Sequence, residues 1–458
     1  MLKKIAFFNP QGNFDRNDSH LTEHPDFGGQ LVYVKELAKA MSKLGLKIDV
    51  ITRKIIDLDW PEFSETFDYY PNYENLRIIR VPFGGNKFLN KELLWEYLGD
   101  YVKEIIRFYN SEGEFPDFVT THYGDGGISG AMFLKKTGIN FSFTGHSLGA
   151  QKKDKFSSFN NKFLEQKYRF SIRIAAERSA IKYSTFVVTS TEQEKTVQYM
   201  HQAYKDLTLE NLKKFVVISP GVNTEIFNTF EDEKVQHFEK FLKIYNKSFI
   251  ILSSRIDPKK NHISVVKSYL ENKKLQEIFN LIIVVRGIEN VFEYSKKETE
   301  DAKILSQIIH LLKENNLLEN IIFLNIDSQI ELASLYKAAS KFKSIFALTS
   351  LYEPFGLAII EAMACGLPVV ATKSGGPIEI LNNGYYGKVV DPNDTNEISS
   401  AILEIFKDYN KYQKLGINRV ISNYTWEKTA EKYLEKIHST YKMKTEHVQL
   451  PLFFEKLI

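Results

Sequence analysis

The stretch that decides the fold is residues 344–372, SIFALTSLYEPFGLAIIEAMACGLPVVAT. It begins with an apolar run, Ser344–Leu348, and ends with a second one, Val369–Thr372. Between the two runs, Gly356 is placed to open a helix and Gly366 to close it, because glycine tolerates the conformations that helix ends often require. A strand, a helix and a second strand in this order are typical of a βαβ unit, so we expect parallel strands here.

The same alternation of apolar runs and amphipathic segments extends over most of the chain. The expected strands before residue 220 are Lys4–Phe8, Lys47–Ile51, Arg77–Val81, Phe118–Thr121, Phe141–Thr144 and Phe186–Thr189. Those after it are Phe249–Ser253, Leu281–Val285, Ile321–Leu324 and the two runs above. The clearest expected helices are 29–44, 394–406, which Asp394 can cap, and 425–443.

Ser219–Asn223 interrupts this alternation near the middle of the chain. The sequence therefore predicts an α/β protein of two domains, residues 1–220 and 221–435. In each domain a parallel sheet is expected to carry helices on both faces.

Composition excludes several classes of protein. The 458 residues carry 60 Lys and Arg against 57 Asp and Glu, and the net charge of +3 argues against a surface for nucleic acid or anionic membranes. The single cysteine, Cys365, excludes an intramolecular disulfide and a cysteine-based metal site. No apolar run approaches the ~20 residues of a membrane span, so we expect a cytoplasmic protein without membrane contact.

Common catalytic signatures are absent, except for one match. The sequence has no Walker A loop, no G-x-G-x-x-G and no H-E-x-x-H. Gly145–Gly149, GHSLG, fits the G-x-S-x-G of a nucleophile elbow, with Ser147 as the nucleophile. An elbow needs a helix directly behind the serine, and residues 150–155 are polar and weakly patterned. A serine hydrolase using Ser147 is therefore kept as an alternative of a different class.

Two glycine-rich or basic segments are candidate phosphate sites. Gly28-Gly29 stands just ahead of the expected helix 29–44, where free backbone amides favour anions. Arg255 and Lys260 follow the expected strand 249–253, and strand ends of this kind bind ligands in open α/β sheets. Two cations there suit a diphosphate, whereas neighbouring Lys259 is better interpreted as a solvated surface residue.

The segment 353–361 carries the most informative pattern. Backbone amides near Gly356 can hold a diphosphate at the helix start. Glu361 follows about five residues later, roughly 7 Å along the axis, which matches the distance from a diphosphate to a ribose diol. Glu353 would then face the group beyond the phosphates. The alternative for Glu361 is a solvated helix residue, which its apolar neighbours make less suitable.

Several blocks together resemble a known family. Glu353 and Glu361 form its E-x7-E pattern, and with the basic and glycine segments they are similar to the retaining nucleotide-sugar glycosyltransferases of GT-B fold. The similarity is closest to sucrose-phosphate synthases and their bacterial relatives. The blocks that carry it are NPQGN at 9–13, EHPDFGGQ at 23–30, PFGG at 82–85, HYGDGG at 122–127, TGHSLG at 144–149 and the run 349–361.

The resemblance implies a fold and a reaction. Two Rossmann-like doubly wound domains would face a central cleft, with residues 436–458 crossing back to the first domain. Glucose would move from UDP-glucose, on the C-terminal domain, to fructose 6-phosphate, on the N-terminal one, giving sucrose 6-phosphate and UDP. The donor configuration would be retained without a covalent intermediate, and the leaving phosphate would act as the base.

The resemblance also assigns the donor side of the site. Arg255 and Lys260 would neutralise the diphosphate, and Glu361 would bind the ribose. His146 would lie against the donor sugar. The other donor-binding residues would be Gly29, Glu353, Phe355, Gly356 and Leu357, and the catalytic set would be His146, Arg255, Lys260 and Glu353.

The acceptor side departs from the family at one position. By resemblance, the acceptor-binding residues are Gly28, Gln30, Lys91, Tyr123, Ser147, Lys152 and Arg173. Relatives have two consecutive arginines where this chain has Ile172-Arg173, so one acceptor-side cation is missing unless Arg169 replaces it. The departure keeps two alternatives open, a mannosylfructose-phosphate synthase using GDP-mannose and a sucrose synthase using unphosphorylated fructose.

The sequence shows no metal-ligand set, so no cofactor is expected to be required, and stimulation by Mg²⁺ is left open. A sucrose-phosphate phosphatase is the expected partner. A non-catalytic sugar-phosphate binding protein is the third alternative, since it would bind the same ligands without releasing UDP.

Overall fold

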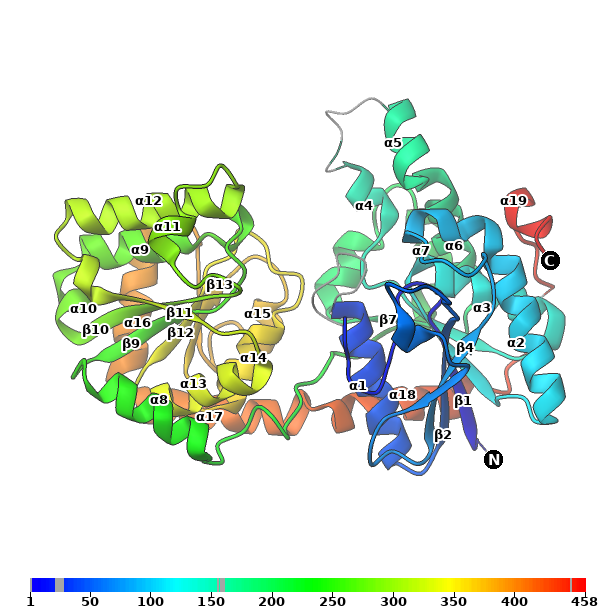
Figure 1. Cartoon of the computed structure of the whole chain (residues 1–458), viewed down its shortest axis with the longest axis horizontal. Coiled ribbons are helices and arrows are strands. Elements are labelled where there is room, and N and C mark those ends of the chain that lie inside the picture. The colour runs from blue at the N-terminus through cyan, green and yellow to red at the C-terminus, as the bar shows by residue number, and fades with distance from the viewer. Residues whose placement is uncertain (1, 21–28, 155, 157–160, 445–446) are drawn as a thin grey trace. The chain divides into compact units, whose positions relative to one another are not determined.

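The structure is a computed structural model that describes residues 2–20, 29–154, 156, 161–444 and 447–458. The chain forms two compact units (Figure 1). Unit 1 comprises Met1–Ser219 and Thr429–Ile458, and unit 2 comprises Pro220–Lys428. The chain thus returns to unit 1 at Thr429, earlier than the expected 436. Among the residues described, no helix is long and apolar enough to cross a membrane.

Unit 1 is built on an eight-stranded sheet in the order β3-β4-β2-β1-β5-β6-β7-β8. Its neighbouring strands are parallel except for the pair β3–β4, which is antiparallel. The strands are β1 (Lys4–Phe8), β2 (Lys47–Arg53), β3 (Phe67–Tyr69), β4 (Leu76–Val81), β5 (Phe118–His122), β6 (Phe141–Thr144), β7 (Phe186–Thr189) and β8 (Phe215–Val217).

Helices cover both faces of this sheet because its strands alternate in side-chain direction. On β6, Phe141 and Phe143 are fully buried in apolar clusters with residues of α3 and α6. The hydroxyls of Ser142 and Thr144 point the other way and lie 3.1 and 3.2 Å from Tyr433 Oη of α18. The helices are α1 (Gly29–Lys43), α2 (Leu98–Glu112), α3 (Tyr123–Thr137), α4 (Gly149–Asp154), α5 (Asn161–Tyr168), α6 (Phe170–Tyr183), α7 (Lys205–Glu210), α18 (Trp426–Thr440) and α19 (Leu452–Glu455).

Unit 2 is built on a six-stranded, fully parallel sheet in the order β11-β10-β9-β12-β13-β14. Its strands are β9 (Ser248–Leu252), β10 (Phe279–Val285), β11 (Ile321–Asn325), β12 (Ile345–Leu348), β13 (Val369–Thr372) and β14 (Lys388–Val390). On β9, Phe249 and Ile251 pack into one apolar cluster, with α8, α13 and α14. Ile250 and Leu252 pack into the other, with α9, α12 and α16.

The helix expected at 394–406 in unit 2 is present as α16. Asp394 caps α16 by accepting bonds of 2.9 Å from the amides of Asn396 and Glu397, as expected from the sequence. The helices are α8 (Glu233–Lys243), α9 (His262–Glu271), α10 (Lys273–Ile278), α11 (Val291–Tyr294), α12 (Glu300–Glu314), α13 (Gln329–Ser340), α14 (Leu357–Ala364), α15 (Pro377–Ile380), α16 (Thr395–Lys407) and α17 (Tyr409–Asn423).

Both units have the strand order of a doubly wound Rossmann-like fold, apart from edge strands in unit 1. The order reverses between β9 and β12 in unit 2 and between β1 and β5 in unit 1. Ligands of such sheets bind beyond the carboxyl ends of the strands at this reversal. Most of the predicted site residues in the described ranges follow β9, β12, β1, β5 or β6, so the fold places them at or beside these two points, whereas Lys91 follows β4.

Candidate active site

In unit 2, the loop after β9 is fastened to the segment after β12. The amide of Leu351 donates to the carbonyl of Lys259 at 2.8 Å, and Thr349 Oγ1 donates to the carbonyl of Asn261 at 3.2 Å. Asn261 has a left-handed φ of 54° and donates from Nδ2 to the carbonyl of Pro392 at 2.7 Å. These bonds hold the two predicted donor segments next to each other.

This arrangement brings Lys260 and Glu353 together. Lys260 Nζ lies 2.6 Å from Glu353 Oε2, with side chains 22% and 12% exposed. Ser350 Oγ donates to the same oxygen at 3.4 Å. Arg255 lies on the same loop, is exposed, and has no ion-pair partner within the described part of the chain. A bound anion would therefore meet one free cation and one cation already balanced by a carboxylate.

The backbone of Glu353 is held by a glycine pair after β13. The Glu353 amide donates to the carbonyl of Ser374 at 3.0 Å, and the Gly376 amide donates to the carbonyl of Glu353 at 2.9 Å. A Cβ on Gly375 would lie 1.9 Å from the Glu353 oxygen, and its φ is 112°. Only glycine allows this close approach. Sequence analysis missed this support, although the Gly375-Gly376 pair beside an expected strand end was its signal.

The helix α14 begins and ends at the expected glycines. Gly356 and Gly366 have left-handed φ values of 107° and 85°. Phe355 and Gly356 are buried and Leu357 is partly exposed. The helix start is therefore where the sequence placed it, and its role as an anion site stays a prediction.

Glu361 occupies an apolar environment on α14. Its flanking residues Ile360 and Ala362 are fully buried, whereas Glu361 itself is partly exposed. Burial raises the pKa of the Glu361 carboxyl to about 7. No residue in the described ranges donates a hydrogen bond to this carboxylate, so it is available to a ligand hydroxyl. The solvated-residue alternative for Glu361 does not fit these surroundings.

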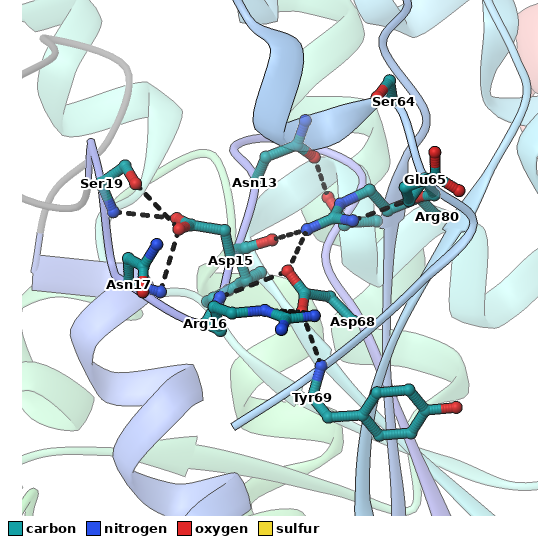
Figure 2. Close-up of polar contacts among 12 residues, drawn as sticks. Asn13, Asp15, Arg16, Asn17, Ser19, Ser64, Glu65, Asp68, Tyr69 and Arg80 are labelled. Atoms are coloured by element: carbon teal, nitrogen blue, oxygen red, sulfur yellow. Dashed lines mark hydrogen bonds and ion pairs between the residues drawn. The ribbon is translucent and has the colours of Figure 1, made fainter. Parts of the chain in front are cut away.

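In unit 1, the segment that leaves β1 is fixed by two carboxylates. Figure 2 shows Asp15 accepting bonds from Asn17 and Ser19, whose amides lie 3.0 and 2.8 Å away. Asp68 of β3 accepts a bond of 3.2 Å from the fully buried guanidinium of Arg80. Arg80 also donates to the carbonyl of Phe14, so these contacts fix the chain in the loop between β1 and α1.

The predicted phosphate site at the start of α1 is described in part. Gly28 lies outside the described residues. Gly29 is the exposed first residue of α1, and a Cβ there would meet no atom within 4 Å. Gln30 donates from Nε2 to Asn9 Oδ1 at 2.8 Å, which links the helix to the end of β1.

His146 is held by a second histidine that sequence analysis missed. Its Nε2 lies 3.0 Å from Nδ1 of His122, and Thr120 Oγ1 lies 3.2 Å from the other nitrogen of His122. The Tyr33 ring packs edge-on against His146 at 4.9 Å. Burial lowers the pKa of His146 to about 3, so the imidazole is neutral at pH 7. Its φ of 56° is a strained conformation of the kind that occurs at functional sites.

Three of the predicted acceptor residues contact one another. Ser147 Oγ lies 3.5 Å from Tyr123 Oη and accepts a bond of 3.3 Å from Arg173 Nη2. The Arg173 guanidinium lies 4.3 Å from the centre of the Tyr123 ring. Arg173 is nevertheless buried and paired with Glu177 at 2.8 Å. Its charge is thus balanced inside the protein, which sequence analysis did not foresee.

The remaining predicted acceptor cations lie around this cluster. Lys91 and Arg173 both act electrostatically on Asp125, whose pKa burial raises to about 7 despite these cations. Lys152 lies on α4, with its ammonium 6.0 Å from the Tyr168 ring.

Ile172, where the resemblance implies an arginine, packs against an apolar cluster of unit 1. Arg169, the suggested replacement, forms an ion pair of 2.9 Å with Glu96.

The local argument against a nucleophile elbow was wrong in one respect, because the helix α4 does begin at Gly149. The contacts of Ser147 still argue against a hydrolase. Its Oγ is bonded to Arg173 and Tyr123, and no histidine among the described residues contacts it. His146 instead contacts His122, so Ser147 lacks the base that activates a serine nucleophile.

Over the described ranges, no group of three or more His, Cys, Asp or Glu side chains could hold a metal ion.

Comparison with known proteins identifies the family of this chain. The family model for glycosyl transferases group 1 matches residues 233–419, and that for the sucrose synthase first GT-B domain matches residues 1–247. A protein of Thermosipho melanesiensis described as a probable sucrose-phosphate synthase is 57% identical over 99% of both chains. This chain belongs to the sucrose-phosphate synthase family of GT-B glycosyltransferases. It is therefore a hexosyltransferase that functions in sucrose-phosphate synthesis.

More distant relatives agree in fold. The sucrose-phosphate synthase of Zea mays is 29% identical, over 94% of this chain but only 47% of the plant protein. The solved sucrose-phosphate synthase of Thermosynechococcus elongatus is 23% identical, with a TM-score of 0.69 over 95% of this chain and 98% of that one. These comparisons confirm the GT-B fold expected from the sequence.

Proposed function

We propose that the enzyme transfers glucose from UDP-glucose to fructose 6-phosphate, giving sucrose 6-phosphate and UDP with retention of configuration. The observation that carries the donor half is the Lys260–Glu353 pair beside the start of α14. A diphosphate binding there would take Lys260 as its counter-ion. Glu353 would then be free to accept bonds from the glucosyl hydroxyls.

The proposed chemistry depends on stabilising a leaving group. Negative charge grows on the diphosphate as the glycosidic bond breaks, so fixed cations at Lys260 and Arg255 lower the barrier. The acceptor hydroxyl attacks from the face that the diphosphate leaves, and its proton passes to the leaving phosphate. Neutral His146 then acts as a hydrogen-bond partner for the donor sugar rather than as a general acid.

Glu361 supplies the nucleotide contact in this proposal. Its carboxylate lies in apolar surroundings, no donor to it is found among the residues that the structure describes, and a ribose diol would provide two. We propose that no metal cofactor is required, and that a phosphatase consumes the phosphorylated product.

A panel of donors and acceptors tests the proposal. UDP-glucose and GDP-mannose are each combined with fructose 6-phosphate and fructose, and the product is identified by NMR. The expected result is UDP release that depends on fructose 6-phosphate and an α-glucosyl product. A preference for fructose would favour a sucrose synthase activity, and a preference for GDP-mannose would favour mannosylfructose-phosphate synthesis. A covalent sugar trapped on Glu353 would contradict the same-face mechanism.

A further inference from the structure

A buried carboxylate on α6 lies at the centre of the acceptor half of unit 1. Glu177 has no solvent exposure. It accepts bonds from Arg173 Nε at 2.8 Å, from the Gly149 amide at 3.0 Å, and from Tyr204 Oη. Tyr204, also fully buried, in turn accepts a bond of 3.1 Å from the amide of Ala150. The first two amides of α4 are thus both bound by this pair.

The same carboxylate orients the guanidinium that holds Ser147. With Nε fixed by Glu177, Arg173 directs Nη2 to the Ser147 carbonyl at 2.7 Å and to its hydroxyl at 3.3 Å. The turn 146–150 is therefore held at its middle by Arg173 and at its end by Glu177 and Tyr204.

Two motif glycines lie directly against this network. A Cβ on Gly149 would lie 2.9 Å from Arg173 Cδ, and a Cβ on Gly124 would lie 3.1 Å from Glu177 Cγ. Both glycines belong to the segments that resembled the family, yet neither has a left-handed backbone. Their small size lets the Arg173–Glu177 pair pack directly against both segments.

We propose that Glu177 is the positioning residue of the acceptor half, acting through Arg173 and Tyr204 to fix the turn that presents His146 and Ser147. Arg173 is then part of this support rather than a direct ligand of the acceptor phosphate. The inference rests on the proposed function only for the identity of the acceptor. The test therefore uses whichever acceptor the wild-type enzyme prefers in the panel above.

The decisive variant is Glu177→Gln in the full-length enzyme, assayed well below its melting temperature. Loss of the charge weakens the bonds to Arg173 and to the Gly149 amide, so the acceptor KM should rise roughly 10- to 100-fold while the donor KM stays within about twofold. Tyr204→Phe removes one bond to Glu177 and keeps the packing, so it should raise the acceptor KM by roughly 3- to 10-fold. Asp206→Asn is the matched control, because it weakens an ion pair at the surface between Asp206 of α7 and Arg178, the neighbour of Glu177 on α6.

Three results would overturn the proposal. If Arg173 binds the acceptor phosphate itself, freeing it from Glu177 should lower the acceptor KM, which is the opposite sign. Unchanged acceptor kinetics with a lower melting temperature would show a purely structural role. An equal rise in donor and acceptor KM would show general loosening. If Glu177→Gln does not fold, Tyr204→Phe decides between the same outcomes. A wild-type enzyme that ignores fructose 6-phosphate would refute the proposed function alone.

Discussion

The two units share a strand order but use their charged residues differently. In unit 2, Arg255 is exposed and the Lys260–Glu353 pair is partly exposed, so both cations can meet a ligand. In unit 1, the arginines Arg80 and Arg173 are buried and bonded to carboxylates that fix loops. Unit 2 therefore exposes charge at the proposed diphosphate site, whereas these two buried arginines of unit 1 support the backbone.

Lys260→Ala is expected to have the largest effect, because it removes the cation that faces growing charge on the leaving group. The turnover should fall by about 100- to 1000-fold, as when one preorganised donor is lost from other sites of charge development. The measurement is kcat for UDP release at saturating UDP-glucose.

Lys259→Ala is the matched control for this change. Lys259 is exposed on the same loop, and its contact to Leu351 uses the backbone carbonyl, which the substitution keeps. Its turnover should stay within about twofold of wild type. Equal losses in the two variants would show that the loop, and not the Lys260 charge, matters.

The two units also differ in how much of each could be predicted from the sequence. Lys260, Glu353 and Glu361 could be named as candidates because their signals are local, lying within one loop or one helix that follows an apolar strand, and their roles stay predictions. The strands were predicted well where they are buried, as in Phe141–Thr144, but β3, β8 and β14 were missed because each has only three residues.

The acceptor half was harder to predict because its contacts join distant segments. Glu177 meets Gly149 and Tyr204 across sequence separations of 28 and 27 residues. A glutamate in an amphipathic helix carries no sign that it is buried. His122 was likewise quoted in a motif without a role, since its contact with His146 depends on the pairing of β5 with β6.

Lys152→Ala tests whether Lys152 acts as a cation for the acceptor phosphate in unit 1. If Lys152 binds the acceptor phosphate, the KM for fructose 6-phosphate should rise roughly 10- to 150-fold, the value of one charge-assisted bond. Donor affinity should hardly change. Lys153→Ala, one residue further on α4, is the control. If wild type uses fructose as well as fructose 6-phosphate, no phosphate clamp exists in unit 1.

Glu361→Gln should change donor binding and stability in opposite directions. The pKa of Glu361 is raised to about 7 in the folded enzyme, above the ordinary value of 4.5, so its ionisation opposes folding increasingly as the pH rises from 4.5 to 7. The ligand-free variant should therefore melt at a higher temperature than wild type at pH 8. Its donor KM should rise roughly tenfold or more, because the ribose loses a charged acceptor.

The pH dependence provides a second check on Glu361. In wild type the donor KM should fall as the pH rises through about 7, because the Glu361 carboxylate forms there. This step should vanish in Glu361→Gln. A step that persists would point to Asp125 of unit 1, whose pKa is also about 7.

His146 should contribute least to the pH dependence, although it is a predicted catalytic residue. Burial lowers its pKa to about 3, so the ring stays neutral from pH 5 to 8 and cannot produce a step in kcat. His146→Gln should lower the turnover, since a sugar contact is lost, while the shape of the kcat profile stays the same.

The same pKa of His146 predicts how the stability of the enzyme depends on pH. The unfolded chain binds a proton below its ordinary pKa of 6.5 and the folded ring does not, so this group reduces stability as the pH falls from 6.5 toward 3. Thermal melts of wild type and His146→Gln between pH 4 and 8 measure this difference. If wild type does not lose more stability than the variant on acidification, His146 is protonated in the fold and its role as a neutral partner is wrong.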